Sequence, residues 1–226
     1  MIHYHGTPIT PNSALMTMAG KNFCISYVRP DNLKVCQKIG QSLMFDNGAF
    51  SAKTRGFEFD PYGFYEWLDP ILAHPHWGVV PDVIDGTVEQ QRKMVKDWPF
   101  PKAFGVPVWH LGLPISYLLE LIDDWGKACL GSSGEYWQVG SFKWSGRMDE
   151  VFNQLAKTFG RIPWLHGMRM LGQGDGPWPL ASADSTNVAL NHAEQIECAG
   201  CMAKRIDSQN PASKWHHKAT QEGLFA

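Results

Sequence analysis

Short apolar runs alternate along the chain with segments in which apolar residues recur at helical spacing. Most of these runs are apolar at successive positions, as expected of parallel strands that helices cover on the outside. The pattern predicts eight strands, at Ile2–His5, Phe23–Tyr27, Ser42–Phe45, Trp77–Val80, Ala103–Trp109, Lys127–Leu130, Pro163–His166 and Leu180–Ala183.

The segments between these runs predict helices with defined ends. Thr87 and Gln90 have the spacing of a capping box at the start of Thr87–Asp97, and Asp31 suits the N-cap of Asp31–Ile39. Glycines follow several of these segments, where helices commonly end. The other predicted helices are Pro61–Ala73, Pro114–Trp125, Met148–Phe159 and about Val188–Ala203, with a short helix before Phe23 and mostly loop at Leu171–Pro179.

Eight alternations of strand and helix predict an α/β protein with a compact (β/α)8 barrel of the TIM type. We expect a single domain over residues 1–226, in which 204–226 forms a C-terminal tail. The alternative is an open doubly wound sheet, but no glycine-rich phosphate-binding turn follows the first strand. The number of strands favours the barrel.

Composition narrows the class of protein. Hydrophobic residues make up 44% of the 226 residues and charged residues 19%, which excludes a disordered or fibrous chain. The net charge of -2 gives no overall basic field for nucleic acid or an anionic membrane. The chain lacks an apolar run of the roughly 20 residues that span a bilayer, and its start lacks the features of a signal peptide. Because five cysteines also argue against a disulfide scaffold, we expect a cytoplasmic protein without a membrane partner.

Polar residues and glycines follow nearly every predicted strand. In a (β/α)8 barrel the active site is built at the carboxyl ends of the strands, from several different loops. The pattern therefore predicts one shared site at the mouth of the barrel. Its candidate residues are His5-Gly6, Ser26, Asp46-Asn47-Gly48, Asp82 to Gly86, His110 to Gly112, Gly131 to Glu135, His166 to Arg169, and Asp184 to Thr186.

Two of these carboxylates directly follow apolar strands. Asp46 and Asp184 would face each other across the mouth, where paired carboxylates can divide the roles of nucleophile and general acid/base. Asp82 and Asp85 would lie nearby. The alternative is that each Asp caps the helix that follows it.

The order of the motifs resembles the guanine transglycosylases, the tRNA-guanine (queuine) enzymes and their relatives that act on DNA. The resemblance runs from about Leu43 to Asn187. Phe45 to Phe50 is similar to that family's Asp-Ser-Gly-Gly-Phe motif. Four further segments resemble family motifs in the same order: Phe104 to His110 (Phe-Gly-Ile-Val-Gln-Gly), Leu130 to Glu135 (Gly-Gly-Leu-Ala/Ser-Val-Gly-Glu), Leu165 to Met168 (Leu-Met-Gly-Val) and Ala183 to Ser185 (Phe-Asp-Cys).

The resemblance implies roles for individual residues. Asp184 would attack C1′ of the target nucleotide, and Asp46 would act as general acid/base for the leaving and incoming bases. Carboxylates stabilise and trap the oxocarbenium-like centre of such a reaction. Asp82 would bind the purine N–H edge. The other implied substrate-binding residues are Asp85, Gly131, Ser132, His166, Met168 and His110, the last of which is either a base contact or a loop residue.

The chain departs from the family's zinc motif. In place of Cys-x-Cys-x-x-Cys with a distant His, it has Cys198-Ala-Gly-Cys201, with His192 upstream and His216 and His217 downstream. The set Cys198, Cys201 and His217 has the ligand types of a tetrahedral structural zinc site. The alternative is that the two cysteines are small buried residues. The exchange chemistry itself requires no cofactor.

The chain is also short for the tRNA enzymes, and Thr186-Asn187-Val188 stands where the family has an Arg-containing segment. We therefore expect a compact pentosyltransferase whose partners are a nucleic acid, DNA or tRNA, and a 7-deazaguanine, with a homodimer or partner protein left open. Such an enzyme must take the base out of its stack. The alternatives are a barrel N-glycosidase or nucleoside hydrolase, and a non-catalytic barrel that binds a deazapurine or nucleotide.

Overall fold

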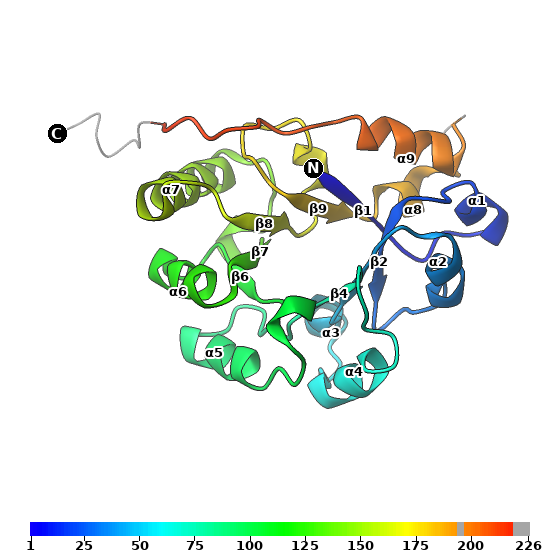
Figure 1. Ribbon diagram of the computed structural model, residues 1–226, viewed down its shortest axis with the longest axis horizontal. Helices are drawn as coiled ribbons and strands as arrows, with labels where there is room; N and C mark the ends of the chain where they lie inside the picture. The colour runs from blue at the N-terminus through cyan, green and yellow to red at the C-terminus, as the bar shows by residue number, and fades with distance from the viewer. Residues whose placement is uncertain (194–196, 219–226) are drawn as a thin grey trace.

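A parallel sheet surrounded by helices forms the centre of the molecule (Figure 1). The structure is a computed structural model that describes residues 1–193 and 197–218. Every predicted strand coincides with at least one strand of this sheet. The strands are β1 (Ile2–Gly6), β2 (Asn22–Ser26), β3 (Leu43–Asp46), β4 (Trp77–Val79), β5 (Gly105–Val106), β6 (Val108–His110), β7 (Lys127–Gly131), β8 (Trp164–Gly167) and β9 (Ser182–Ser185).

The sheet has nine strands in the order β5-β4-β3-β2-β1-β9-β8-β7-β6, and each observed pairing is parallel. Only Pro107 separates β5 from β6. The backbone of Val80 donates to the carbonyl of Val106, and that of Cys129 donates to the carbonyl of Pro107. The two ends of the strand order therefore adjoin along the chain, and the sheet is nearly closed into a barrel. An open doubly wound sheet does not describe this arrangement.

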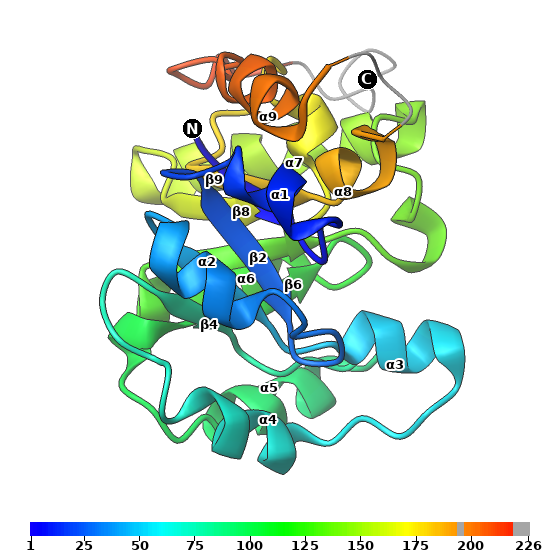
Figure 2. The ribbon, with the colours of Figure 1, turned by 90° about the vertical axis from the view of Figure 1, so that its right-hand side faces the viewer.

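Helices surround the sheet (Figures 1 and 2). Thr87 caps α5 and makes the predicted capping box with Gln90. The predicted N-cap at Asp31 is wrong, because α2 begins at Leu33 and its N-cap residue is Asn32. The helices of the described residues are α1 (Asn12–Met16), α2 (Leu33–Ile39), α3 (Ala49–Arg55), α4 (Pro61–Leu68), α5 (Val88–Lys96), α6 (Ile115–Trp125), α7 (Phe142–Phe159), α8 (Asn187–Asn191) and α9 (Ala199–Asp207).

Several helices differ from their predictions, and α4 ends at Leu68 rather than at Ala73. Helix α7 begins at Phe142 rather than Met148, because the Ser141 side chain caps it by accepting from the backbone of Trp144. Helix α3, which the sequence analysis did not predict, follows β3 and lies at the right-hand edge of Figure 2. The single helix predicted over Val188–Ala203 is two helices, since Cys198 has extended backbone angles and caps α9. Residues 194–196 of that prediction lie outside the described residues.

Two groups of buried side chains form the core. The larger group lies between the helices and the outer face of the sheet, and includes Phe23, Trp109 and Leu165. The smaller group points into the barrel, and includes Tyr4, Met44 and Cys129. Because side chains alternate between the two faces of a strand, the inward positions form layers along the barrel axis. The layer beyond these apolar side chains carries the polar residues of the site.

The C-terminal segment covers the gap left between β8 and β9, whose connection contains only a short 3-10 helix, Leu171–Gln173. In Figure 1 this segment, drawn in red, crosses from α9 toward α7. The Trp215 ring lies 5.3 Å from that of Phe152, and its indole N–H donates to Asn153. Since α9 runs through Asp207, the segment begins at Ser208 rather than at residue 204. In the described part of the chain, no helix has both the length and the apolar composition needed to cross a membrane.

Candidate functional site

A cavity of about 500 Å³ opens at the carboxyl ends of the strands. This volume is in the usual range for a small-molecule site. The predicted residues that line it come from the ends of six different strands: Asp46, Asp82, His110, Gly131, Ser132, Met168 and Asp184. Asp46, His110 and Asp184 belong to strands β3, β6 and β9 themselves, so the sheet fixes their positions directly. The structure thus brings seven of the predicted site residues together.

Asp46 lies in a partly apolar, negatively charged environment. The register pairs Ser26 of β2 with Asp46 of β3, and the Ser26 hydroxyl donates to Oδ2 of Asp46 at 2.9 Å. Burial, together with the negative charges of Asp184 and Asp82, raises the pKa of the Asp46 carboxyl to about 6, against the lowering effect of the hydrogen bond from Ser26. A carboxyl with this pKa exchanges protons readily near neutral pH.

Asp184 is held by two groups on one oxygen. Its Oδ1 accepts the backbone N–H of Arg169 at 2.8 Å and lies 3.2 Å from Nε2 of His166. Asp184 lines the cavity, and within residues 1–193 and 197–218 its other oxygen, Oδ2, accepts no hydrogen bond. The carboxylate is therefore oriented through one oxygen while the other stays available.

Neither carboxylate caps a helix. Gly48 occupies the N-cap of α3 and Thr186 that of α8, and both helices lack a side-chain cap. The capping alternative for Asp46 and Asp184 is therefore wrong. Both side chains remain available to the cavity.

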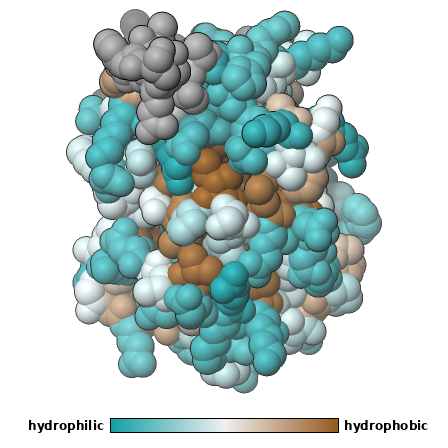
Figure 3. Space-filling view, turned by 90° about the vertical axis from the view of Figure 1, so that its left-hand side faces the viewer, coloured by the Kyte–Doolittle hydropathy of each residue, from teal (hydrophilic) through white to brown (hydrophobic). Residues whose placement is uncertain are grey.

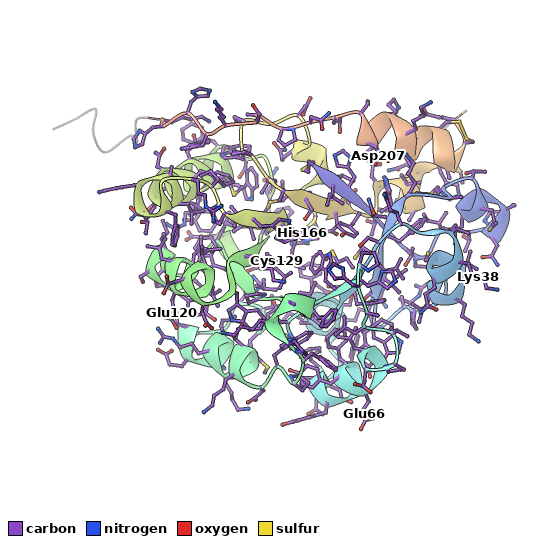
Figure 4. All side chains as sticks on the ribbon, viewed as in Figure 1. Lys38, Glu66, Glu120, Cys129, His166 and Asp207 are labelled. Carbon is purple, nitrogen blue, oxygen red and sulfur yellow. A yellow bond between two sulfur atoms is a disulfide. The ribbon has the colours of Figure 1, made fainter. Side chains whose placement is uncertain are left out.

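His166 does not line the cavity, contrary to its prediction as a substrate-binding residue. Its side chain is completely buried near the barrel centre, where Figure 4 labels it. Nδ1 lies 2.8 Å from the Ser182 hydroxyl, and Nε2 faces Asp184. Because Ser182 and Asp184 are two residues apart on β9, both point to the same face of the strand and both reach the ring. His166 supports Asp184 from below.

Asp82 is the centre of a second polar group. Asn47 donates to its Oδ1 at 2.9 Å, and Nε2 of His110 lies 2.7 Å from its Oδ2. The Ser133 hydroxyl lies 3.3 Å from Nδ1 of the same imidazole. A carboxylate only accepts hydrogen bonds, so Nε2 of His110 carries the hydrogen and Nδ1 accepts from Ser133. His110 is therefore not a free loop residue. It lines the cavity and also fixes the orientation of Asp82.

The β7 end supplies backbone to the cavity wall. A side chain at Gly131 would clash with the His110 ring, because its Cβ would lie 2.8 Å from Nδ1. Ser132 is buried, and its hydroxyl accepts from the Trp144 indole at 2.9 Å. Its carbonyl oxygen accepts from the guanidinium of Arg169. Met168 follows β8 and adds an apolar side to the cavity.

Asp85 lies outside the cavity, and the prediction that it contacts substrate finds no support in its position. Its side chain is about half exposed and lies 3.9 Å from Nζ of Lys53. Its φ of 60° places it in the left-handed region, at the bend before α5. The two neighbouring aspartates of this loop therefore have different surroundings.

The sequence analysis gave no role to the residues at the rim of the cavity. These are two exposed arginines, Arg29 and Arg55. Phe50 on α3 also lines the cavity without a predicted role, and Arg169 lines it from the predicted segment His166 to Arg169. The guanidinium carbon of Arg169 lies 4.0 Å from the centre of the Phe50 ring. Phe50 belongs to the quoted motif Phe45 to Phe50, which is the one signal that could have indicated it. Arg29 lies in the turn after β2 and Arg55 is the last residue of α3, so no single sequence motif joins the two.

The cysteines fall into two groups. Cys24, Cys36 and Cys129 are free and buried. Burial raises the pKa of the Cys24 thiol well above its usual value, and the negative charge of Asp184 contributes. Cys24 lines the cavity floor but is therefore a protonated thiol rather than a nucleophile at neutral pH.

Cys198 and Cys201 form a disulfide at the N-terminus of α9. A metal binds cysteine as the thiolate, so zinc at this pair requires reduction of the disulfide. Of the described residues, no group of three or more His, Cys, Asp or Glu side chains is placed to hold a metal ion. The structure does not bring His217 into such a group with the two cysteines.

A second hollow of about 480 Å³ lies between α5 and α6. Helices α5 and α6 lie at the left of Figure 1, the side that faces the viewer in Figure 3, where apolar and hydrophilic surface are interspersed. Four of the charged residues of this hollow form two ion pairs, Arg92 with Glu120 and Lys102 with Asp124. It contains no group comparable to Asp46 and Asp184.

Comparisons of the chain with protein-family models, with curated proteins and with solved structures find no match. The cavity and the motif resemblance are therefore what indicates a function for this chain.

Proposed function

We propose that the protein is a guanine transglycosylase-like pentosyltransferase, which replaces a guanine of nucleic acid by a 7-deazaguanine through a glycosyl-enzyme intermediate on Asp184. One observation carries the proposal. Asp46 and Asp184 line one cavity, and their surroundings differ in the way that a nucleophile and a general acid/base require. Retaining glycosyl transfer requires two carboxylates in one cavity, one as nucleophile and the other as general acid/base.

In the first step, the free oxygen of Asp184 attacks C1′ of the nucleotide while the bond from C1′ to N9 of guanine breaks. The electron pair of that bond goes to the base, which takes the proton of the Asp46 carboxyl. With its pKa of about 6, Asp46 holds a proton in part of the molecules near neutral pH. The hydrogen bonds to Oδ1 of Asp184 keep the nucleophile aimed at C1′.

In the second step, the incoming base gives its N9 proton to the Asp46 carboxylate. N9 forms the new bond to C1′, and the ester bond between C1′ and Asp184 breaks to restore the carboxylate. Asp46 thus ends the cycle protonated, as it began. No external acid, base or cofactor enters the balance.

The polar group around Asp82 supports recognition of a purine. Asn47 and His110 use one lone pair on each carboxylate oxygen, which leaves acceptor sites for the N–H edge of guanine. The arginines at the rim support a phosphodiester substrate, because they supply positive charge at the mouth of a cavity lined with carboxylates. As part of this proposal we assign the fold to the (β/α)8 type, counting β5 and β6 as one strand interrupted at Pro107.

The test is incorporation of labelled guanine into duplex DNA and, separately, into bulk tRNA. We expect label in one polymer, and no label with Asp184→Asn, which has nearly the same shape but a much weaker nucleophile. Mass spectrometry of the wild-type protein mixed with the reactive polymer should find a covalent adduct on Asp184.

Two outcomes would contradict the proposal and favour its alternatives. Release of guanine to leave abasic sites, without incorporation, would indicate an N-glycosidase. Binding of guanine that Asp46→Ala and Asp184→Ala leave unchanged, with no turnover in either polymer, would indicate a binding protein.

A further inference from the structure

Arg169 makes contacts that a bound base would make. Its guanidinium carbon Cζ lies over the Phe50 ring, 4.0 Å from the ring centre, and the guanidinium donates to the Ser132 carbonyl. Phe50 and Ser132 both line the cavity. Aromatic rings in such cavities stack on unpaired bases, and backbone carbonyls accept from base edges.

The chemistry of the two groups is also alike. Guanine carries a guanidine-like edge, in which N1–H and the 2-amino group flank one carbon. The arginine guanidinium is a planar cation with a similar fork of N–H donors, and it stacks on aromatic faces. A guanine edge and the Arg169 side chain would therefore compete for the same carbonyl and the same ring.

The backbone holds Arg169 in this place. Its φ is 59°, in the left-handed region that residues other than glycine seldom adopt. Its own N–H donates to Oδ1 of Asp184. The side chain itself is exposed, so it can leave Phe50 without disturbing this backbone contact.

We propose that Arg169 occupies the base site of the free protein and is displaced when the base enters. The inference rests on the proposed function, because it requires that a purine binds in this cavity. Displacement moves the guanidinium toward the rim, where Arg29 and Arg55 already lie. There it binds the phosphate beside the target nucleotide. One side chain thus occupies the base site of the free protein and contacts the phosphate of the bound substrate.

The test measures the affinity of guanine and of 7-deazaguanine by calorimetry. Arg169→Ala should bind both bases about 3- to 10-fold more tightly than the wild type, because it removes a stacking contact and a hydrogen bond that the base must replace. Arg169→Lys keeps the charge but lacks the planar fork, so it should also bind the bases more tightly. Both variants retain the backbone N–H that holds Asp184.

A DNA or RNA oligonucleotide provides the opposite readout. Arg169→Ala should bind the reactive oligonucleotide several-fold more weakly, while Arg169→Lys should retain most of that affinity through its charge. Arg161→Ala is the matched control, because it removes one exposed positive charge from the segment before β8, outside the residues that line the cavity.

Unchanged or weaker base binding by Arg169→Ala would overturn the inference and leave the proposed function intact, provided that the wild type binds the bases. Absence of base binding in the wild type and in both Arg169 variants would overturn the proposed function and the inference with it. Base binding detected only in the variants would support the inference in its strongest form.

Discussion

Nε2 of His166 lies 3.2 Å from Oδ1 of Asp184, below the cavity rather than in its wall. Nδ1 of the same ring lies 2.8 Å from the Ser182 hydroxyl. With Nε2 protonated to serve the carboxylate, Nδ1 accepts from Ser182. Two residues of β9 therefore fix one tautomer of a histidine on β8. The orientation of the proposed nucleophile depends on a side chain that substrate does not reach.

His166→Ala should slow base exchange at least 10-fold and lower the free energy of unfolding by about 2–4 kcal/mol, because it leaves a buried gap and unpaired groups beneath Asp184. His166→Gln supplies an N–H at a similar distance and should recover part of the rate. Steady-state kinetics check both, and we expect kcat to fall with little change in KM. A change in KM alone would contradict the positioning role.

Asp46→Asn should stabilise the protein while it abolishes exchange. The pKa of Asp46 is raised to about 6 in the folded protein, so its ionised form costs stability there. The stability that the protonated carboxyl contributes is fully present below about pH 4 and is lost as the pH rises through about 6. The advantage of Asn should therefore grow from near zero at pH 4 to roughly 1–3 kcal/mol above pH 6. Urea unfolding across this range measures it, and an equal effect at every pH would contradict the argument.

The two half-reactions should respond to pH in opposite directions. Guanine release needs protonated Asp46, so its single-turnover rate should fall about 10-fold per pH unit above pH 6. Attack by the incoming base needs the carboxylate, so its rate should rise with pH until about 6 and then level off. Rapid-quench measurements of each step check this. Parallel pH profiles for the two steps would exclude Asp46 as the shared acid and base.

Asp82 and Asp85 form a matched pair of aspartates on one loop. Asp82→Asn should weaken guanine binding about 10- to 100-fold, since a hydrogen bond to a charged group contributes roughly 1.5–3 kcal/mol. Asp85→Asn removes the same charge outside the cavity and should leave guanine affinity unchanged. Calorimetry on both variants distinguishes a specific contact from the overall charge of the loop, which would affect both equally.

Asp207 attaches α9 to the outer face of β1. Its carboxylate lies 3.2 Å from His3, 2.9 Å from His5 and 2.6 Å from Lys21. Despite burial, the hydrogen bonds from these groups hold the pKa of Asp207 far below its usual value. The stability it contributes is present above about pH 4 and is lost as the pH falls. Asp207→Asn should lower the melting temperature at pH 7, with a smaller effect at pH 3, and an effect that does not depend on pH would contradict this account.

The sequence predicted the strands well because each is a short apolar run that helices cover. The same alternation placed Asp46 and Asp184 correctly, since a residue that ends a parallel strand lies at the barrel mouth. His166 was misassigned for a related reason. Strand β8 extends to Gly167, so His166 lies within the strand rather than at its end. Its ring points into the barrel interior, one layer below the cavity.

Other parts of the site depend on contacts that a linear pattern does not contain. Helix α3 is short, and its apolar positions Ala49 and Ala52 give a weak periodic signal. The contact between Phe50 and Arg169 joins residues more than a hundred positions apart, and it follows from an unusual φ at Arg169. The disulfide between Cys198 and Cys201 depends on the start of α9, where Cys198 is the N-cap residue and Cys201 lies in the first turn. The number of cysteines in the chain does not indicate it.

The pairing of β1 with β9 has a consequence for synthesis. His3 lies opposite Ala183, and His5 lies opposite Ser185. At about 5–20 residues per second, β1 emerges roughly 10–40 s before its partner. During that interval one edge of β1 has no native neighbour, and its backbone groups are open to pairing with another chain. The nascent protein is therefore most prone to aggregate before the last strand is made, and slower translation should prolong that exposure.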